Sequence, residues 1–290
     1  MSTTAKFFFI LLGLYIAYNM VDKFDPDSIK GKRVIVTGAS TGIGEELAYS
    51  YAKLGARLLI TARRENILQQ VVQKCMELGA QEAHYIPLDM GNMSHTKILI
   101  EEAEQRFHGL DILILNHIAG NKLELWNGQF DRLNGMFDVN FKAYVHLATY
   151  ALPMLKKSNG SITVMSSFAG KCGQPYTAAY SASKFALGGF FEALRQEFTM
   201  QDINVSITIC IIGSIKTENA IKFSKEVMNT DIFATSASDT AEAVMRGTYH
   251  KQLEAYYPWG MTRPTAILKE LFPKFIFWIC RLVFTTSGDS

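Results

Sequence analysis

The 290-residue sequence has few cysteines, little net charge and no repeated or low-complexity segment. Its four cysteines, Cys75, Cys172, Cys210 and Cys280, show no C-x-x-C pair and no zinc-ligand spacing, so we expect no metal site and leave their disulfide state open. The formal net charge of +2 gives no reason to expect a nucleic-acid partner. Hydrophobic residues make up 48% of the chain, which is enough for a substantial core.

Short apolar runs alternate with helical patterns between residues 25 and 260, without an intervening linker. This alternation is typical of an α/β fold in which helices cover a parallel sheet. We therefore predict a single Rossmann-type domain, a doubly wound parallel sheet, over residues 25–260. Residues 1–24 are predicted to be a hydrophobic signal-anchor or signal peptide, and residues 261–290 an apolar C-terminal helix and tail.

A glycine-rich turn joins the first predicted strand, residues 32–37, to a helical pattern at residues 45–54. Glycines allow the backbone to approach a pyrophosphate, and a helix N-terminus attracts anions. The candidate cofactor contacts in this turn are Gly38, Ser40, Thr41, Gly42, Ile43 and Gly44. Their spacing, G-x-x-x-G-x-G, differs from the commoner G-x-G-x-x-G, and a tight turn without a ligand is the alternative.

The second predicted strand, residues 57–61, is followed by two arginines and not by a carboxylate. NAD-specific proteins usually place a carboxylate there for the ribose hydroxyls, whereas a guanidinium suits the 2′-phosphate of NADP. We therefore expect NADP as the cofactor, with Arg63 as the main contact, Arg64 beside it, and Ser40 and Thr41 as supporting donors. Arginines on a solvated loop are the alternative.

Tyr180 and Lys184 are four residues apart, which places both side chains on one face of a helix. An ammonium beside a tyrosine hydroxyl favours the phenolate and brings proton exchange closer to neutral pH. Ser167, at the end of a predicted strand, could bring a second hydroxyl to the same carbonyl oxygen, and Ser166 is the competing serine. The pattern predicts acid–base chemistry at this tyrosine.

Together these motifs resemble those of the short-chain dehydrogenase/reductase family over residues 31–257. Residues 37–44 match the family's T-G-x-x-x-G-I-G turn, and residues 116–120 resemble its N-N-A-G motif, with His117 as a departure. The positions that match the family's catalytic tetrad are Asn140, Ser167, Tyr180 and Lys184.

The resemblance implies a role for each member of this tetrad. Tyr180 would donate a proton in reduction and, as phenolate, accept one in oxidation. Lys184 would lower the pKa of Tyr180 and hold the nicotinamide ribose. Asn140 would keep a water in the proton path, and Ser167 would stabilise the developing charge on the substrate oxygen. Tyr180 and Lys184 are thus also expected to contact the cofactor.

Further cofactor contacts are expected from the same resemblance at Asp89, Met90, Asn116, His117, Ile118, Ile215 and Thr217. Asp89 would contact the adenine edge, and Thr217 the amide side of the cofactor. An exposed turn aspartate is the alternative for Asp89. A loop histidine without a partner is the alternative for His117.

The His117-Ile118 pair, residues 180–191 and residues 204–208 point to the 11β-hydroxysteroid dehydrogenase branch of the family, type 1 and type 1-like. This resemblance implies interconversion of a hydroxyl and a ketone on a steroid of the cortisol/cortisone type, and a homodimer. The expected substrate contacts are Ser167, Gln174, Tyr180, Ile212, Gly213 and Ser214.

Gln174 and Ser214 depart from the type 1 pattern, which has a tyrosine and a leucine there, and this weakens the expectation of a glucocorticoid substrate. Other lipophilic alcohols or carbonyls such as retinoids are the first alternative. A membrane-tethered NADP-binding protein with little turnover is the second.

Residues 7–18 are apolar but short for a bilayer span of about 20 residues. No good cleavage site follows, so we expect an uncleaved anchor, with a removed signal and secretion as the alternative. Lys6 before the segment and Asp22 after it place the catalytic domain in the lumen of the endoplasmic reticulum. The sequons at Asn159 and Asn204 would then be glycosylated.

Residues 268–284 combine an apolar, aromatic-rich run with flanking cations. This composition suits a helix that dips into a bilayer surface, and a contact between subunits is the alternative.

Overall fold

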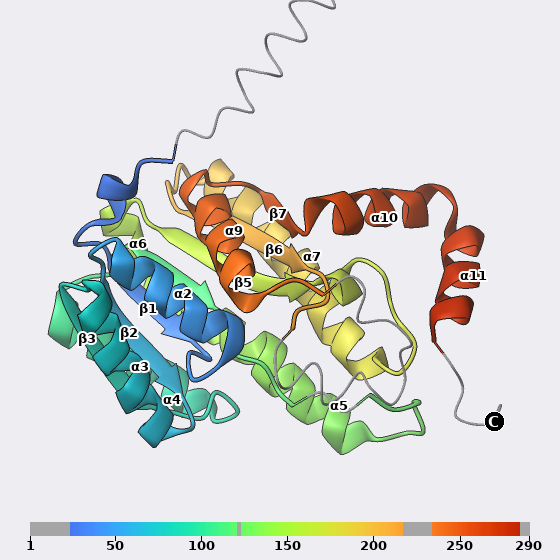
Figure 1. Ribbon diagram of the computed structural model, residues 1–290, viewed down its shortest axis with the longest axis horizontal. Helices are drawn as coiled ribbons and strands as arrows, with labels where there is room; N and C mark the ends of the chain where they lie inside the picture. Colours follow the sequence, from blue (N-terminus) through green and yellow to red (C-terminus); the bar gives the residue numbers. More distant parts are fainter. Residues whose placement is uncertain (1–23, 121–122, 217–233, 285–290) are drawn as a thin grey trace, which may run out of the picture.

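The computed structural model describes residues 24–120, 123–216 and 234–284 (Figure 1). The predicted N-terminal anchor and the predicted cofactor contact Thr217 lie outside the described residues. Within the described ranges, no helix combines the length and the apolar character needed to cross a membrane.

Seven parallel strands form one sheet in the order β3-β2-β1-β4-β5-β6-β7. The strands are β1 Arg33–Thr37, β2 Arg57–Ala62, β3 Glu82–Pro87, β4 Ile112–Leu115, β5 Ser161–Ser167, β6 Ser206–Ile212 and β7 Glu254–Tyr257. The chain leaves β1 toward one edge and resumes at β4 toward the other, so the crossovers reverse direction between these two strands. The predicted doubly wound parallel sheet is confirmed, and its switch point lies where such sheets bind ligands.

Helices connect the strands and cover both faces of the sheet (Figure 1). The α-helices are α2 Gly42–Lys53, α3 Glu65–Leu78, α4 Met93–Phe107, α5 Phe130–Phe137, α6 Ala143–Ser158, α7 Ala178–Met200, α9 Ala237–Tyr249, α10 Trp259–Leu271 and α11 Pro273–Val283. Three short helical turns accompany them, η1 Pro26–Ile29, η2 Asp138–Lys142 and η3 Phe168–Gly170. Parallel strands need such crossovers, because a tight turn cannot reverse the chain between them.

Two apolar cores lie on opposite faces of the sheet. Successive residues of a strand point to opposite faces, so Val34 and Val36 of β1 join the core beneath α2, α3 and α9, whereas Ile35 joins the core beneath α4, α6 and α7. Both cores are needed because a central parallel strand is buried on each face, which explains the continuous apolar runs in the sequence.

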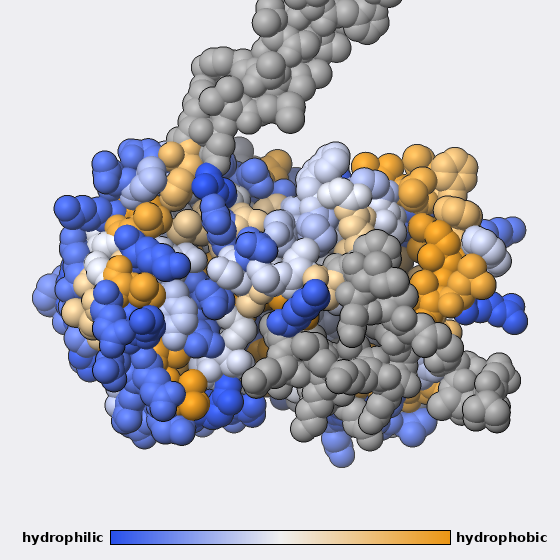
Figure 2. Space-filling view, in the orientation of Figure 1, coloured by the Kyte–Doolittle hydropathy of each residue, from blue (hydrophilic) through white to orange (hydrophobic). Residues whose placement is uncertain are grey.

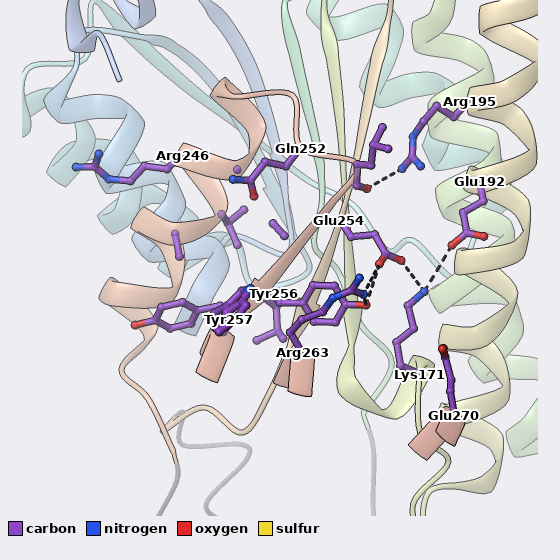
Figure 3. Close-up of a pocket in the computed structure, with 17 residues that line it drawn as sticks. Lys171, Glu192, Arg195, Arg246, Gln252, Glu254, Tyr256, Tyr257, Arg263 and Glu270 are labelled. Carbon is purple, nitrogen blue, oxygen red and sulfur yellow. Dashed lines mark hydrogen bonds and ion pairs between the residues drawn. The ribbon is translucent and has the colours of Figure 1, made fainter. Parts of the chain in front are cut away.

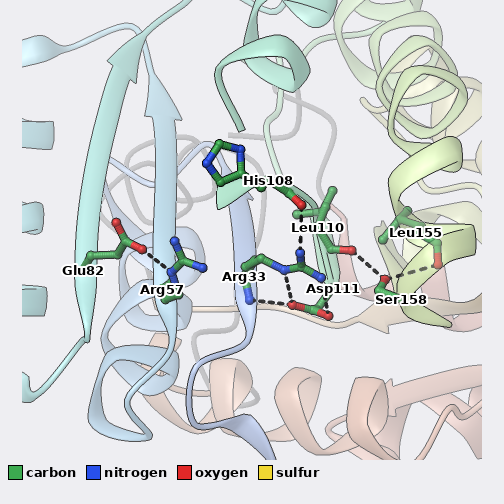
Figure 4. Close-up of polar contacts among 8 residues, drawn as sticks. All are labelled: Arg33, Arg57, Glu82, His108, Leu110, Asp111, Leu155 and Ser158. Carbon is green, nitrogen blue, oxygen red and sulfur yellow. Dashed lines mark hydrogen bonds and ion pairs between the residues drawn. The ribbon is translucent and has the colours of Figure 1, made fainter. Parts of the chain in front are cut away.

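Ion pairs hold the amino ends of the strands, away from the switch point (Figure 4). The Arg33 guanidinium donates to both oxygens of Asp111, with Nε–Oδ2 2.7 Å and Nη2–Oδ1 3.0 Å. Burial alone would raise the pKa of Asp111, but the hydrogen bonds and charge of Arg33 outweigh it and lower that pKa. Arg57 Nε pairs with one oxygen of Glu82 across β2 and β3. These pairs stabilise the sheet and lie far from the candidate site.

The apolar C-terminal run, predicted as one helix, forms two. Phe272 has φ −134° and interrupts the helical backbone, and Pro273 begins α11. We call residues 259–284 the C-terminal arm. Its outer surface is strongly hydrophobic (Figure 2), with exposed side chains at Leu271, Phe272, Phe275, Phe277, Trp278 and Leu282.

Candidate active site

The glycine turn after β1 has no space for a side chain at Gly38 or Gly44. Gly38 and Gly42 have φ of 67° and 64°, a left-handed backbone that glycine adopts without strain. A Cβ on Gly44 would overlap the carbonyl oxygen of Gly38 and lie 2.5 Å from Asn116 Nδ2. Thr41 precedes α2, and its side chain does not cap the helix, so the first amides of α2 are available to an anion. The turn therefore fits the pyrophosphate of a dinucleotide.

The two arginines after β2 differ in their surroundings. Arg64 Nη2 donates to the carbonyl oxygen of Ser40 at 3.3 Å and to Ser40 Oγ at 3.1 Å, which draws this guanidinium to the glycine turn. Arg63 is exposed beside it. The sequence favoured Arg63 as the main phosphate contact, whereas the structure brings Arg64 to the predicted donor Ser40.

The turn after β3 holds Asp89 and Met90. Asp89 is exposed, and its Oδ1 accepts a hydrogen bond from the backbone N–H of Gly91 at 2.9 Å. The Met90 side chain is buried in the core beneath α4 and α6. Only Asp89 therefore presents a side chain to a ligand from this turn.

The segment after β4 is bound tightly to the end of β1. Asn116 Nδ2 donates to the carbonyl oxygens of Thr37 and Gly38 at 3.1 and 3.3 Å. His117 is only 5% exposed, and its ring nitrogens contact Thr37 Oγ1 at 2.9 Å and the Val139 carbonyl oxygen at 3.0 Å. The alternative of a partnerless loop histidine is wrong, because the ring is buried and bonded at both nitrogens. Ile118, by contrast, is exposed.

Tyr180 and Ser167 meet at the carboxyl edge of the sheet. Ser167 is the last residue of β5, and Tyr180 lies in the first turn of α7. Burial raises the pKa of Tyr180, and a hydrogen bond with the Ser167 hydroxyl acts in the opposite direction. The competing Ser166 is buried and donates to the Lys184 carbonyl oxygen at 3.5 Å. Ser167 is therefore the serine that can share a substrate oxygen with Tyr180.

Lys184 is buried one helical turn after Tyr180. Its Nζ donates to the Met165 carbonyl oxygen at 2.7 Å and lies 5.3 Å from the ring centroid of Tyr144 and 5.8 Å from that of Tyr180. Burial lowers the pKa of Lys184 to about 7, because the charged form loses its hydration. The predicted proximity of Lys184 to Tyr180 is present, but the predicted lowering of the Tyr180 pKa is not, because burial of the hydroxyl raises that pKa and outweighs the Ser167 hydrogen bond.

Asn140 lies in the π-helical turn η2 and is fully buried. Its Oδ1 accepts from the Ala119 backbone N–H at 2.8 Å, and its Nδ2 donates to Ser183 Oγ at 3.2 Å. Asn140 thereby joins the segment after β4 to helix α7. Irregular turns of this kind often occur at functional sites.

The sequence profile described as short chain dehydrogenase matches residues 32–227. The hydroxysteroid 11-beta-dehydrogenase 1-like protein of Xenopus tropicalis is 45% identical over 276 residues, which cover 95% of this chain and 96% of the relative. The chain belongs to the short-chain dehydrogenase family. Its counterpart of the same name in Gallus gallus is 46% identical over 250 residues, covering 86% of each chain.

Solved structures agree on the fold of this short-chain dehydrogenase. A short-chain dehydrogenase/reductase from Burkholderia phymatum in complex with NAD gives a TM-score of 0.75 at 21% identity and covers 85% of this chain and 95% of its own. An alcohol dehydrogenase from Thermococcus sibiricus complexed with 5-hydroxy-NADP gives 0.67 at 23% identity, covering 78% and 96%. Family and site together identify an NAD(P)-dependent oxidoreductase.

The substrate side of the dehydrogenase has features that the sequence did not single out. A small cavity beside Tyr180 is lined by Trp126, Arg132 and Tyr176, among others. Tyr176 has φ 64°, a strained value for a bulky residue, and its ring lies 6.3 Å from that of Phe284 at the end of the C-terminal arm. No pattern in the sequence around Tyr176 predicts this positive φ.

The predicted substrate contacts around β6 and before α7 occupy different surroundings. Ile212 ends β6 and, like Ile215, is buried in the core beneath α2 and α9. The Ser214 side chain is exposed, and Gly213 donates its N–H to the Tyr257 carbonyl oxygen at 2.8 Å. Gln174 is half-buried in the loop before α7.

A larger groove of about 830 Å³ runs along β7, between α7, α9 and α10 (Figure 3). None of the four tetrad residues lines it. Several of its charged side chains are paired or hydrogen-bonded: Lys171 Nζ lies 2.5 Å from Glu254 Oε1, and Arg263 Nη1 donates to Tyr256 Oη at 2.9 Å. Arg195 donates to the Ile207 and Leu253 carbonyl oxygens. This network holds the sheet edge and the C-terminal arm in place, and it is separate from the candidate active site.

Proposed function

We propose that this short-chain dehydrogenase interconverts a hydroxyl and a ketone on a steroid, with NADP as its cofactor. The observation that carries the proposal is the convergence of Tyr180, Ser167 and Lys184 at the end of β5, beside a turn that admits a pyrophosphate. The relatives at 45% and 46% identity support a steroid substrate, because both are named as hydroxysteroid 11-beta-dehydrogenase 1-like proteins.

Tyr180 handles the proton in this proposal. In reduction its hydroxyl donates a proton to the substrate oxygen, and the Ser167 hydroxyl donates a hydrogen bond to the same oxygen. The Lys184 ammonium, 5.8 Å from the ring centroid, favours the phenolate that remains. When bound, the nicotinamide ring supplies or accepts the hydride. The reaction direction follows the ratio of the two cofactor forms.

The preference for NADP rests on charge. Arg63 and Arg64 follow β2, and Arg64 already contacts Ser40 in the glycine turn. A doubly charged 2′-phosphate would accept hydrogen bonds from these guanidiniums and from Ser40 Oγ. An uncharged ribose hydroxyl would accept weaker hydrogen bonds from the same donors.

Aromatic side chains near Tyr180 are the local support for a lipophilic substrate. The rings of Trp126 and Tyr176 border a small depression at Tyr180 that also holds the Arg132–Glu124 ion pair, and the Phe284 ring lies against that of Tyr176. Gln174 is half-buried and Ser214 is exposed, and their departure from the type 1 pattern favours a ligand other than a glucocorticoid as the competing substrate. Retinoids and other lipid carbonyls form that second class.

We propose the lumen of the endoplasmic reticulum as the location, with the N-terminal segment as an anchor. Asn159 and Asn204 are exposed before β5 and β6, as glycosylation acceptors must be. The hydrophobic surface of the C-terminal arm, with Lys274 and Arg281 at its border, suits a lipid surface. A homodimer is part of the same proposal.

The test is turnover by the purified full-length protein. NADP with cortisol and NADPH with cortisone are followed by nicotinamide absorbance and by steroid products, with NAD and NADH in parallel. Tyr180→Phe removes only the proton donor and should lower kcat by about 100-fold to 10,000-fold. The matched control is Tyr150→Phe, since Tyr150 is exposed on α6.

The proposal is supported if wild type and Tyr150→Phe turn over the steroid and Tyr180→Phe does not. Turnover with retinal but not with either steroid would move the substrate to the second class. Tight cofactor binding without turnover on any of these compounds would contradict catalysis and favour a binding protein.

A further inference from the structure

A buried chain of contacts runs behind the catalytic lysine and is centred on His117. The imidazole lies between Thr37 at the end of β1 and Val139 in η2, and its centroid is 4.5 Å from that of Tyr144. Tyr144 and Thr37 are both fully buried. No part of the proposed proton transfer uses this ring directly, yet it touches three elements that carry the site.

The partners of His117 define its protonation. A carbonyl oxygen only accepts hydrogen bonds, so Nε2 carries the hydrogen that is donated to Val139. Thr37 Oγ1 lies 2.9 Å from Nδ1 and 3.1 Å from the Ile114 carbonyl oxygen, so these two acceptors share its single hydroxyl hydrogen. Burial and, to a smaller extent, the charge of Lys184 lower the pKa of His117 to about 3, against a hydrogen bond to Val139 that acts in the opposite direction. The ring is therefore neutral at physiological pH and does not place a second cation beside the lysine.

Two of the three contacts of His117 lead to members of the tetrad. Val139 immediately precedes Asn140, whose side chain holds the Ala119 amide and Ser183. The His117 backbone carbonyl accepts from Tyr144 Oη at 2.8 Å, and the Tyr144 ring faces Lys184 Nζ at 5.3 Å. An ammonium over an aromatic face is attracted by the ring quadrupole. The His117 ring thus contacts the turn that carries Asn140 on one side and the Tyr144 ring that packs against Lys184 on the other.

We propose that His117 is a positioning residue of the proton-transfer site: its neutral imidazole fixes the η2 turn that carries Asn140 and the Tyr144 ring that lies against Lys184. The inference rests on the proposed oxidoreductase function for its kinetic consequence, but its structural consequence requires no substrate. A shift of about 1 Å in such a group can lower kcat by about 100-fold.

Two substitutions separate the hydrogen bonds from the packing. His117→Phe keeps an aromatic ring against Tyr144 and removes both side-chain hydrogen bonds. His117→Gln keeps an amide N–H that can donate to Val139 and an oxygen that can accept from Thr37. The matched control is His146→Phe, because His146 is half-buried on α6 and its ring contacts Tyr150, at 5.9 Å between centroids.

The measurements are hydrogen exchange of the cofactor-free full-length protein and steady-state kinetics at a temperature where each variant is fully folded. For His117→Phe we expect faster exchange at the Ala119 amide and within residues 138–142. We also expect a kcat at least about 10-fold below wild type, with the KM for the carbonyl substrate within about 3-fold. His117→Gln should recover most of kcat, and His146→Phe should match wild type in both measurements.

Wild-type exchange at residues 119 and 138–142 in His117→Phe would overturn the inference, as would an unchanged kcat. An equal loss of kcat in both His117 variants, in the absence of faster exchange, would also contradict it. If the wild-type protein turns over no steroid or retinoid, the proposed function fails, and the exchange measurement still decides the role of His117.

Discussion

Replacing Lys184 by methionine is expected to stabilise the cofactor-free protein below pH 7. Lys184 is 3% exposed, and burial lowers its pKa from 10.5 to about 7. Below pH 7 the lysine is protonated in both the folded and the unfolded state, and the folded state bears the full cost of burying the charge. A difference of about 3.5 between the two pKa values corresponds to about 5 kcal/mol, at about 1.4 kcal/mol for each pKa unit.

The substitution also removes a hydrogen bond. Lys184 Nζ donates to the Met165 carbonyl oxygen at 2.7 Å, and leaving that oxygen unpaired costs about 1–3 kcal/mol. The net stabilisation at pH 6 is therefore about 2–4 kcal/mol. Between pH 7 and 10.5 the unfolded state binds more protons than the folded state, so the wild-type stability rises with pH. The advantage of Lys184→Met should shrink over this window and reverse between about pH 8 and about pH 10.

Urea unfolding of the two proteins at pH 6, 7, 8, 9 and 10 measures this difference directly, because other titrating groups cancel between them. A difference in unfolding free energy that does not change with pH would refute the reasoning, since it would mean that Lys184 titrates normally in the folded state. A variant less stable than wild type at pH 6 would refute it as well. Lys184→Met should also have no measurable turnover, so stability and activity oppose each other at this residue.

Four further substitutions test other parts of the site. Arg64→Ala should raise the KM for NADPH by about 10-fold to 100-fold and leave the KM for NADH unchanged. Arg63→Ala should raise the KM for NADPH by less. Equal effects on the two cofactors would exclude a 2′-phosphate contact. Gly44→Ala should abolish dinucleotide binding in a fluorescence titration, because the new methyl group overlaps the Gly38 carbonyl oxygen; wild-type affinity would show that the turn can widen. Phe284→Ala should raise the KM for the lipophilic substrate by about 3-fold to 10-fold through movement of Tyr176, with kcat retained; a loss confined to kcat would contradict this placement of the arm.

The features that could be predicted from the sequence are local ones. The Tyr180–Lys184 spacing places both side chains on one face of α7, and the glycine turn between β1 and α2 follows from the order of strand, glycines and helix. Helix α2 begins at Gly42, whereas the sequence predicted its start at Glu45, so the predicted boundary was wrong by about one turn. Alternation of apolar runs with helical patterns predicted the doubly wound sheet, because each βαβ unit is a short stretch of chain.

The branch of the family was also predicted from short motifs, and relatives at 45% and 46% identity carry that name. NADP, the steroid substrate, the luminal location and the homodimer stay predictions. Thr217 and the N-terminal anchor lie outside the described residues.

The three-dimensional fold decided the rest, because the partners are distant in the chain. His117 looked like a loop residue, but its ring contacts lie 80 and 22 residues away, at Thr37 and Val139. Arg64 reaches back 24 residues to Ser40, and Lys184 reaches 19 residues to Met165. Residue patterns encode which face of a helix or strand is buried, and they do not encode which distant group that face will meet. Local spacing in the sequence therefore predicts which residues take part in proton transfer. The burial and hydrogen bonds that set their pKa values depend on the packing of distant parts of the chain.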